Sequence, residues 1–118
     1  MYNLNTKRAI IGSNAKMEWV SGSFGSHVSY LYPSTIMNGD SSNCEFTGIT
    51  FAGATQDLDT GCKVIINGSN NSANVDTKSI SKDGGVNTFR SAVTVGRKAE
   101  NARVAFSCQS LMLDNISR

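Results

Sequence analysis

Apolar and polar residues alternate along several short runs of this chain. In the run 103–108, Val104, Phe106 and Cys108 fall on one face of an extended segment, with polar or small residues on the other face. The run 62–67 shows the same period of two, though less completely. Successive side chains of a β-strand point to opposite faces, so this pattern predicts short strands rather than helices.

A phrase made of a turn followed by a strand recurs along the chain. It begins at Gly12, Gly39, Gly68 and Gly96, at intervals of 27, 29 and 28 residues (39 − 12, 68 − 39 and 96 − 68). A second set of Gly-containing turns lies between these phrases, so each repeat holds about two strands and two corners. A barrel or a sandwich would also place short strands between turns, but a period of this length is typical of stacked repeats. We therefore predict an all-β fold, a parallel β-helix (solenoid) with one coil per repeat.

Polar residues at the corners fit the same fold. Asn14, Asn43, Asn71 and Asn101 fall at equivalent places in the four repeats, where we expect them to stack between coils. Asn tolerates the left-handed backbone that tight corners require, although it is also a common residue in any turn.

The chain is long enough for one domain, so we interpret residues 1–118 as a single β-helix core fragment. A solenoid hides its open ends under atypical capping repeats. Here the last strand-like run ends at Leu113 and the chain stops at Arg118. We therefore expect both ends to be truncated relative to a longer parent protein.

Composition and charge narrow the functional classes. A formal net charge of +2, with scattered Lys and Arg, gives no basic stripe for nucleic acid. No apolar run approaches the roughly 20 residues that span a bilayer, and the first residues lack the apolar core of a signal peptide. We expect a soluble, cytoplasmic protein with no membrane and no nucleic-acid partner.

Little in the sequence points to catalysis. His27 is the one histidine, and nothing in its spacing places a nucleophile beside it. The Gly-rich pieces lack the glycine spacing and the Lys-Ser or Lys-Thr ending of a phosphate-binding loop. We therefore predict no catalytic residues and no enzymatic turnover.

The three cysteines, Cys44, Cys62 and Cys108, are odd in number and widely spaced, which does not suggest a disulfide framework. Each lies in an apolar strand pattern, so the residues alone favour buried, unreactive packing cysteines at all three positions. Thiolates are also the usual ligands of iron-sulfur clusters, and they accept sulfane sulfur as persulfides.

Several segments together resemble one known family. In chain order they are 15–20 (AKMEWV), 32–34 (YPS), 59–61 (DTG), 78–85 (KSISKDGG), 88–90 (TFR) and 107–112 (SCQSLM). In this order they resemble the SufB/SufD family of iron-sulfur cluster assembly scaffold proteins, and the Ser-Ile-Ser-Lys stretch with the Cys108 segment is closer to SufB. The likeness runs from about Asn5 to Arg118.

The resemblance implies a right-handed β-helix that acts as a scaffold in the SUF system. It implies a complex with a SufD-like subunit, through the late coils at about residues 102–114. It also implies a SufC-type ATPase as a partner, bound through parts outside this chain.

By the same resemblance, Cys108 falls where SufB has the cysteine proposed to receive sulfur and to ligate the nascent cluster. It is the one metal or sulfur site that the resemblance assigns here, and Cys44 and Cys62 inherit no role. The iron-sulfur cluster would be transient and present only in the full-length complex, with none expected in this fragment. The family's His and Glu candidate ligands would follow Arg118, and its upstream sulfur-receiving cysteine would precede Met1.

Two other hypotheses remain open. An extracellular β-solenoid that binds carbohydrate or protein surfaces would need exposed aromatic rows, whereas Trp19, Phe46 and Phe106 lie in alternating runs, as core residues would. The isolated chain would instead form a homodimer if its uncovered coil ends paired with each other.

Overall fold

A computed structural model describes residues 2–117, which form β-strands joined by turns and contain no helix. In chain order the strands are β1 (Tyr2–Asn5), β2 (Arg8–Ile11), β3 (Lys16–Phe24), β4 (Val28–Leu31), β5 (Ser34–Met37), β6 (Asn43–Ala52), β7 (Asp57–Ile66), β8 (Ser72–Ser81), β9 (Val86–Val95) and β10 (Arg103–Met112). The all-β prediction is confirmed.

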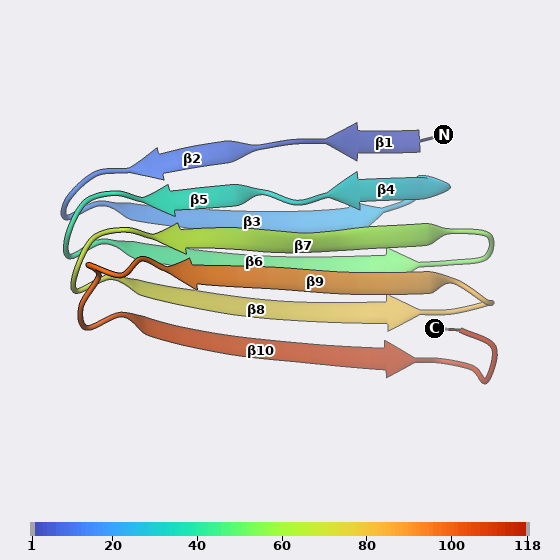
Figure 1. The fold of residues 1–118 in the computed structure, drawn as a ribbon. Helices are drawn as coiled ribbons and strands as arrows, with labels where there is room; N and C mark the ends of the chain where they lie inside the picture. The colour runs from blue at the N-terminus through green and yellow to red at the C-terminus, as the bar shows by residue number, and fades with distance from the viewer. Residues whose placement is uncertain (1, 118) are drawn as a thin grey trace.

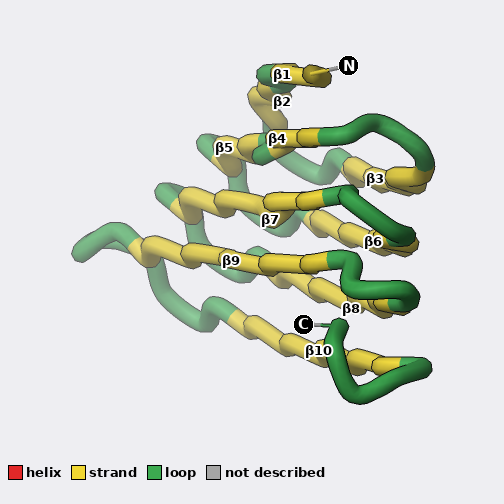
Figure 2. The backbone as a smooth tube through the Cα atoms, turned by 90° about the vertical axis from the view of Figure 1, so that its right-hand side faces the viewer, coloured by secondary structure: helices red, strands yellow, loops and turns green. Residues whose placement is uncertain are grey.

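The strands form two parallel sheets that face each other (Figures 1 and 2). Sheet A holds β1, β2, β4, β5, β7 and β9, and sheet B holds β3, β6, β8 and β10. The chain alternates between the sheets, and each strand pairs with the strand one winding later rather than with its neighbour in sequence. The fold is a parallel β-solenoid of about four coils, with one strand region in each sheet per coil, as the repeat predicted.

A proline divides the second coil of sheet A. Between β4 and β5 stands Pro33, which has no backbone N–H to donate to a sheet. Both short strands nevertheless pair with the single long strand β7, and Lys63 N donates to Pro33 O at 2.9 Å. The interruption therefore changes the hydrogen bonding locally without changing the register of the stack.

The apolar core lies between the two sheets. Met37, Cys44, Val64 and Ile66 are buried in one cluster, and Cys62 is buried in a second cluster with aromatic neighbours. Inward-facing residues of successive coils lie directly above one another, because the sheets are parallel and in register. Cys44 and Cys62 are thus packing residues, as their place in the alternation predicted.

The corners are partly as predicted. Asn14 and Asn101 take the left-handed backbone, with φ of 56° and 54°. In the middle coils the left-handed positions are Ser41 and Asn70 instead. Asn71 is buried, and its side chain donates to Gly39 O and accepts from Ser42 N, so it does bridge successive coils.

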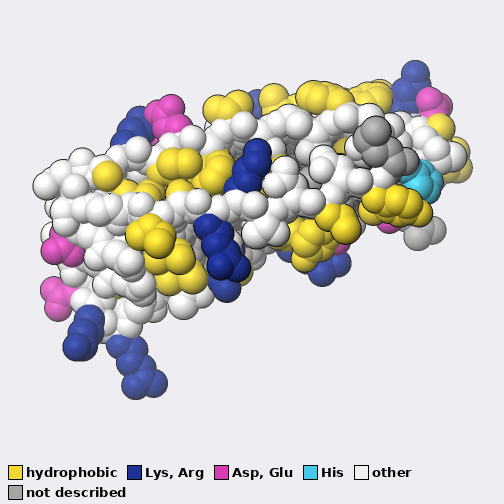
Figure 3. Space-filling model, turned by 90° about the horizontal axis from the view of Figure 1, so that it is seen from above, with side chains coloured by type: hydrophobic (Ala, Val, Ile, Leu, Met, Phe, Trp, Pro, Cys, Tyr) yellow, Lys and Arg dark blue, Asp and Glu magenta, His cyan; other side chains and the backbone are white. Residues whose placement is uncertain are grey.

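The stack is elongated, 46 × 25 × 20 Å, and its end coils expose apolar side chains. Leu4 and Ile10 are exposed at the β1–β2 end, from which hydrophobic patches are visible (Figure 3). In β10, Phe106 is 50% exposed, which corrects its expected place in the core, because no described strand packs beyond β10. None of the described residues belongs to a helix that could cross a membrane.

Candidate functional site

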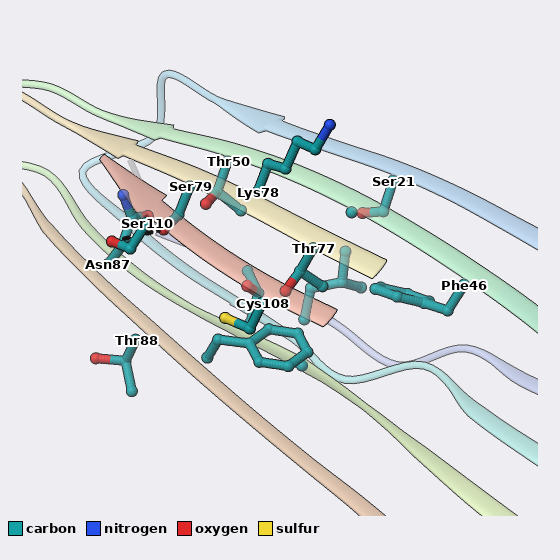
Figure 4. Close-up of a pocket in the computed structure, with 15 residues that line it drawn as sticks. Ser21, Phe46, Thr50, Thr77, Lys78, Ser79, Asn87, Thr88, Cys108 and Ser110 are labelled. Atoms are coloured by element: carbon teal, nitrogen blue, oxygen red, sulfur yellow. Dashed lines mark hydrogen bonds between the residues drawn. The ribbon is translucent and has the colours of Figure 1, made fainter. Parts of the chain in front are cut away.

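Cys108 lies in the middle of β10, on the side that faces the interior of the solenoid (Figure 4). In the register of sheet B it stands beside Thr77, which stands beside Gly48, which stands beside Ser21. We call these four residues the Cys108 column. Thr77 and Gly48 are buried, so the column points into the space between the sheets.

Small side chains in two neighbouring columns leave a cavity of about 210 Å³ between the sheets. Besides the Cys108 column, sheet B lines it with the hydroxyl groups of Thr50, Ser79 and Ser110. From sheet A, Thr60 and Phe89 face the same space. The interior of the solenoid is therefore hollow near Cys108, with hydroxyl groups set among apolar side chains, unlike the packed apolar cluster around Cys44.

Gly48 keeps part of this space open. A Cβ atom built at Gly48 would lie 2.9 Å from Cε1 of Phe46 and 3.5 Å from Cγ2 of Thr77. Protein interiors tolerate few such short contacts, so a larger residue here would displace the Phe46 ring and take up cavity volume.

Two buried polar atoms on the cavity wall have no hydrogen-bond partner within the protein. They are Thr77 Oγ1 in sheet B and Asn87 Oδ1 in sheet A. The amide nitrogen of Asn87 donates to Ile80 O and Ser81 Oγ, both at 2.9 Å, which holds that side chain in place. Buried polar atoms are almost always paired, so these two indicate that a polar group or water occupies the cavity.

The three thiols differ in access. Cys44 and Cys62 are 2% and 4% exposed, and Cys108 is exposed. Burial raises the pKa of the Cys44 thiol, and burial with the nearby Cys44 raises the pKa of Cys62 to about 12. Because the thiolate is the nucleophile and the metal ligand, Cys44 and Cys62 are poor candidates for either role. The strand pattern alone predicted that all three cysteines are buried. This prediction is confirmed for Cys44 and Cys62 and is wrong for Cys108.

The other titratable groups do not assemble into a site. Within residues 2–117, no group of three or more His, Cys, Asp or Glu side chains could hold a metal ion. The His27 ring makes an edge contact with Tyr2. On the outer face of sheet A, the Tyr32 hydroxyl donates to Asp59, and Arg90 lies 3.6 Å from the same carboxylate. These contacts are structural, and nothing places a nucleophile beside them.

Reasoning from the sequence alone did not identify the cavity or Thr77. A signal was present: the members of the Cys108 column recur after 27, 29 and 31 residues, close to the period of the repeat. Aligning the repeats would have shown small residues at each of these positions. The cavity that these small residues leave can be recognised only in the folded structure, where the two sheets face each other.

Comparison with known proteins gives concordant matches along the whole chain. An iron-sulfur cluster assembly SufBD family protein of Staphylococcus saprophyticus is 43% identical over 117 residues, which are 99% of this chain and 25% of that protein. A SufBD family protein of Mycobacterium leprae is 40% identical over 118 residues, 100% of this chain and 14% of that protein. The iron-sulfur cluster assembly protein SufB of Bacillus subtilis is 43% identical over 117 residues, 99% of this chain and 25% of that protein.

The chain thus spans a quarter or less of the length of these curated relatives. Residues 1–118 match the family described as SUF system FeS cluster assembly, SufBD core domain. With its parallel solenoid, its inward-facing Cys108 and this match over its entire length, the chain belongs to the SufBD core family of the SUF iron-sulfur cluster assembly system.

Proposed function

We propose that this chain is the β-solenoid core of a SufB-like scaffold on which iron-sulfur clusters are assembled, with Cys108 as a sulfur acceptor or cluster ligand. The observation that carries the proposal is the place of Cys108: it is the exposed thiol of the three, and it faces a cavity whose wall carries several hydroxyl groups. The family membership supports the chemistry.

A thiolate at this position has two uses in cluster assembly. As a nucleophile it takes a sulfane sulfur from a persulfide donor, and as a ligand it binds iron. Clusters are usually held by four thiolates, and residues 2–117 contain no such ligand group. In this proposal the other ligands come from elsewhere in the assembly, and the chain is a scaffold without turnover of its own.

The proposed contact for a second subunit lies on β10, which pairs with β8 among the described strands. Phe106, Leu111 and Met112 add exposed apolar area to the same strand. Residues 102–114 are the proposed contact for a SufD-like subunit, and a SufC-type ATPase would bind outside this chain.

The extracellular binding hypothesis has less support. Carbohydrate-binding solenoids present aromatic side chains on an outer face, whereas Trp19 and Phe46 are register partners that face the interior. Phe46 is buried, and Trp19 packs against it. On the outer face of sheet B, Phe24 and Phe51 are register partners, but their column continues with Ile80 and Leu111, so no aromatic row among the described residues runs the length of the stack.

Replacement of Cys108 tests the proposal in the protein as the cell makes it, together with its SUF partners. Cys108→Ala should abolish cluster formation, measured by visible absorption and bound iron, while gel filtration shows the complex still assembled. Cys44→Ala, a change at a buried thiol, is the matched control and should retain the cluster. An unchanged iron content in Cys108→Ala would remove the proposed role.

A further inference from the structure

Thr77 is the nearest neighbour of Cys108 in the sheet. The two residues are register partners in β8 and β10, and both face the cavity (Figure 4). Adjacent parallel strands lie about 4.8 Å apart, so the two side chains are within reach of each other or of a small group between them.

The hydroxyl group of Thr77 has no partner. Thr77 is 6% exposed, and its Oγ1 makes no hydrogen bond within the protein, including none with the Cys108 thiol. Its methyl group faces Gly48, which leaves the Cys108 column open on that side. A buried hydroxyl group without a partner is unfavourable, so Thr77 is suited to donate a hydrogen bond to water or to a polar group that enters the cavity.

The size and chemistry of the cavity limit what that group is. A metal ion held by this cavity alone is a poor fit, because the walls offer hydroxyl groups, one amide, one lysine and one thiol among apolar side chains, and no carboxylate or imidazole lines the space. A persulfide on Cys108 is a better fit. It places a second sulfur about 2.05 Å beyond Sγ, with enough volume in the cavity to receive it.

We propose that Thr77 is a positioning residue whose hydroxyl group donates a hydrogen bond to the terminal sulfur of a Cys108 persulfide. This proposal rests on the sulfur-acceptor role proposed for Cys108. The persulfide forms when the Cys108 thiolate attacks the sulfane sulfur of a persulfide donor, R–S–SH. The new S–S bond forms at Cys108 Sγ, the donor S–S bond breaks, and the donor leaves as the thiolate R–S⁻ while the proton stays on the transferred sulfur. No net oxidation occurs. Loss of that proton then gives the anionic terminal sulfur that Thr77 holds.

The hydrogen bond stabilises the anionic terminal sulfur, so reductants attack it more slowly and the persulfide has a longer lifetime. It also holds that sulfur inside the cavity rather than at the exposed mouth of the site, where Cys108 meets solvent. Ser79 is not equivalent to Thr77, because its hydroxyl group already donates to Ser110 Oγ at 3.2 Å. Thr77 is therefore the buried hydroxyl group beside Cys108 that lacks a partner within the protein.

The test uses the chain loaded with glutathione persulfide, with the persulfide on Cys108 followed by mass spectrometry during dithiothreitol treatment. Thr77→Val, which removes the hydroxyl group and keeps the shape, should shorten the persulfide half-life by about threefold or more. Thr77→Ser keeps a hydroxyl group and should restore the persulfide half-life of the unsubstituted chain. Thr50→Val, a change on the same cavity wall outside the Cys108 column, is the matched control and should leave the half-life unchanged.

Alkylation of the unloaded chain by iodoacetamide provides the second readout. The rate at Cys108 should be the same in all variants, since Thr77 makes no hydrogen bond to the bare thiol. Equal persulfide half-lives in Thr77→Val and the unsubstituted chain would overturn the inference. So would a half-life in Thr50→Val as short as that in Thr77→Val, or a change in the alkylation rate of Cys108 in Thr77→Val that matches the change in half-life. If the parent chain itself takes no sulfur at Cys108, the sulfur-acceptor role fails and the inference fails with it. A stable persulfide that is insensitive to Thr77 removes the inference alone.

Discussion

Trp19 and Thr35 join the two sheets through the interior of the solenoid. The indole Nε1 of Trp19 in β3 donates a hydrogen bond of 2.7 Å to Thr35 Oγ1 in β5. The Cys44 thiol donates to the same oxygen at 3.6 Å. Thr35 is buried, so this oxygen depends on protein groups for its hydrogen bonds.

Removing this link should destabilise the chain. Trp19→Phe keeps an aromatic ring and loses the donor, so we expect the free energy of unfolding to fall by about 1–3 kcal/mol. Thr35→Val should cost a similar amount, because it leaves the indole N–H unpaired. Urea unfolding of both single variants and the double variant should give a coupling energy of about 0.5–1.5 kcal/mol. A coupling energy near zero would show that the hydrogen bond contributes nothing.

Gly39 and Gly12 open two successive repeats but differ in their surroundings. A Cβ atom at Gly39 would lie 2.1 Å from Ser13 N, a backbone atom of the preceding coil, whereas one at Gly12 would meet nothing within 4 Å. We expect Gly39→Ala to lower the free energy of unfolding by about 3 kcal/mol or more. Gly12→Ala is the matched control and should stay within about 0.5 kcal/mol. Equal effects, measured by thermal or urea unfolding, would contradict the stacking of these corners.

The cysteines should react in two classes. In the native chain at neutral pH, 5,5′-dithiobis(2-nitrobenzoic acid) should modify Cys108 rapidly and the buried Cys44 and Cys62 about 100-fold more slowly. Unfolding in guanidinium chloride should release all three free thiols at one rate. Rapid reaction of more than one thiol in the native chain would show that the interior opens readily. Cys108→Ala identifies the fast class by removing it.

Stability should fall at alkaline pH, partly through Cys62. Burial raises the pKa of its thiol from 9.0 to about 12 in the folded chain. Below pH 9 the Cys62 thiol is protonated in both the folded and the unfolded chain, and its contribution to the free energy of unfolding is fully present. As the pH rises toward 12 the unfolded chain loses this proton first, so that contribution is lost. Burial and the hydrogen bond to Asp59 also raise the pKa of Tyr32, which adds to the loss above pH 10.

The contribution of Cys62 can be separated from that of Tyr32 by substitution. In urea unfolding between pH 8.5 and 11, Cys62→Ala should be less stable than the parent chain at pH 8.5, because it leaves a small cavity. Its stability should then fall less steeply with pH. Parallel curves for the two chains would show that Cys62 is not protected from ionisation in the folded state.

Local sequence patterns were enough to predict the strands, the number of coils and the burial of two of the three cysteines. Alternation with period two is a local property, because side chains of a strand point to opposite faces, and the recurrence of Gly12, Gly39, Gly68 and Gly96 reports the repeat directly. The same alternation placed Cys44 and Cys62 inside, between the two sheets. It also placed the Asn residues near the corners, but it did not resolve which residue takes the left-handed backbone, because that depends on one or two residues of local register.

The surroundings of Cys108 could not be predicted from local patterns, because they depend on how the coils stack. Alternation gives the direction in which a side chain points, and the exposure of Cys108 depends on what lies beyond β10, which is a property of the whole stack. The cavity likewise belongs to no single segment. It forms because small residues of four coils fall in register and the facing sheet does not fill the space they leave, which is why Thr77 keeps a hydroxyl group without a partner.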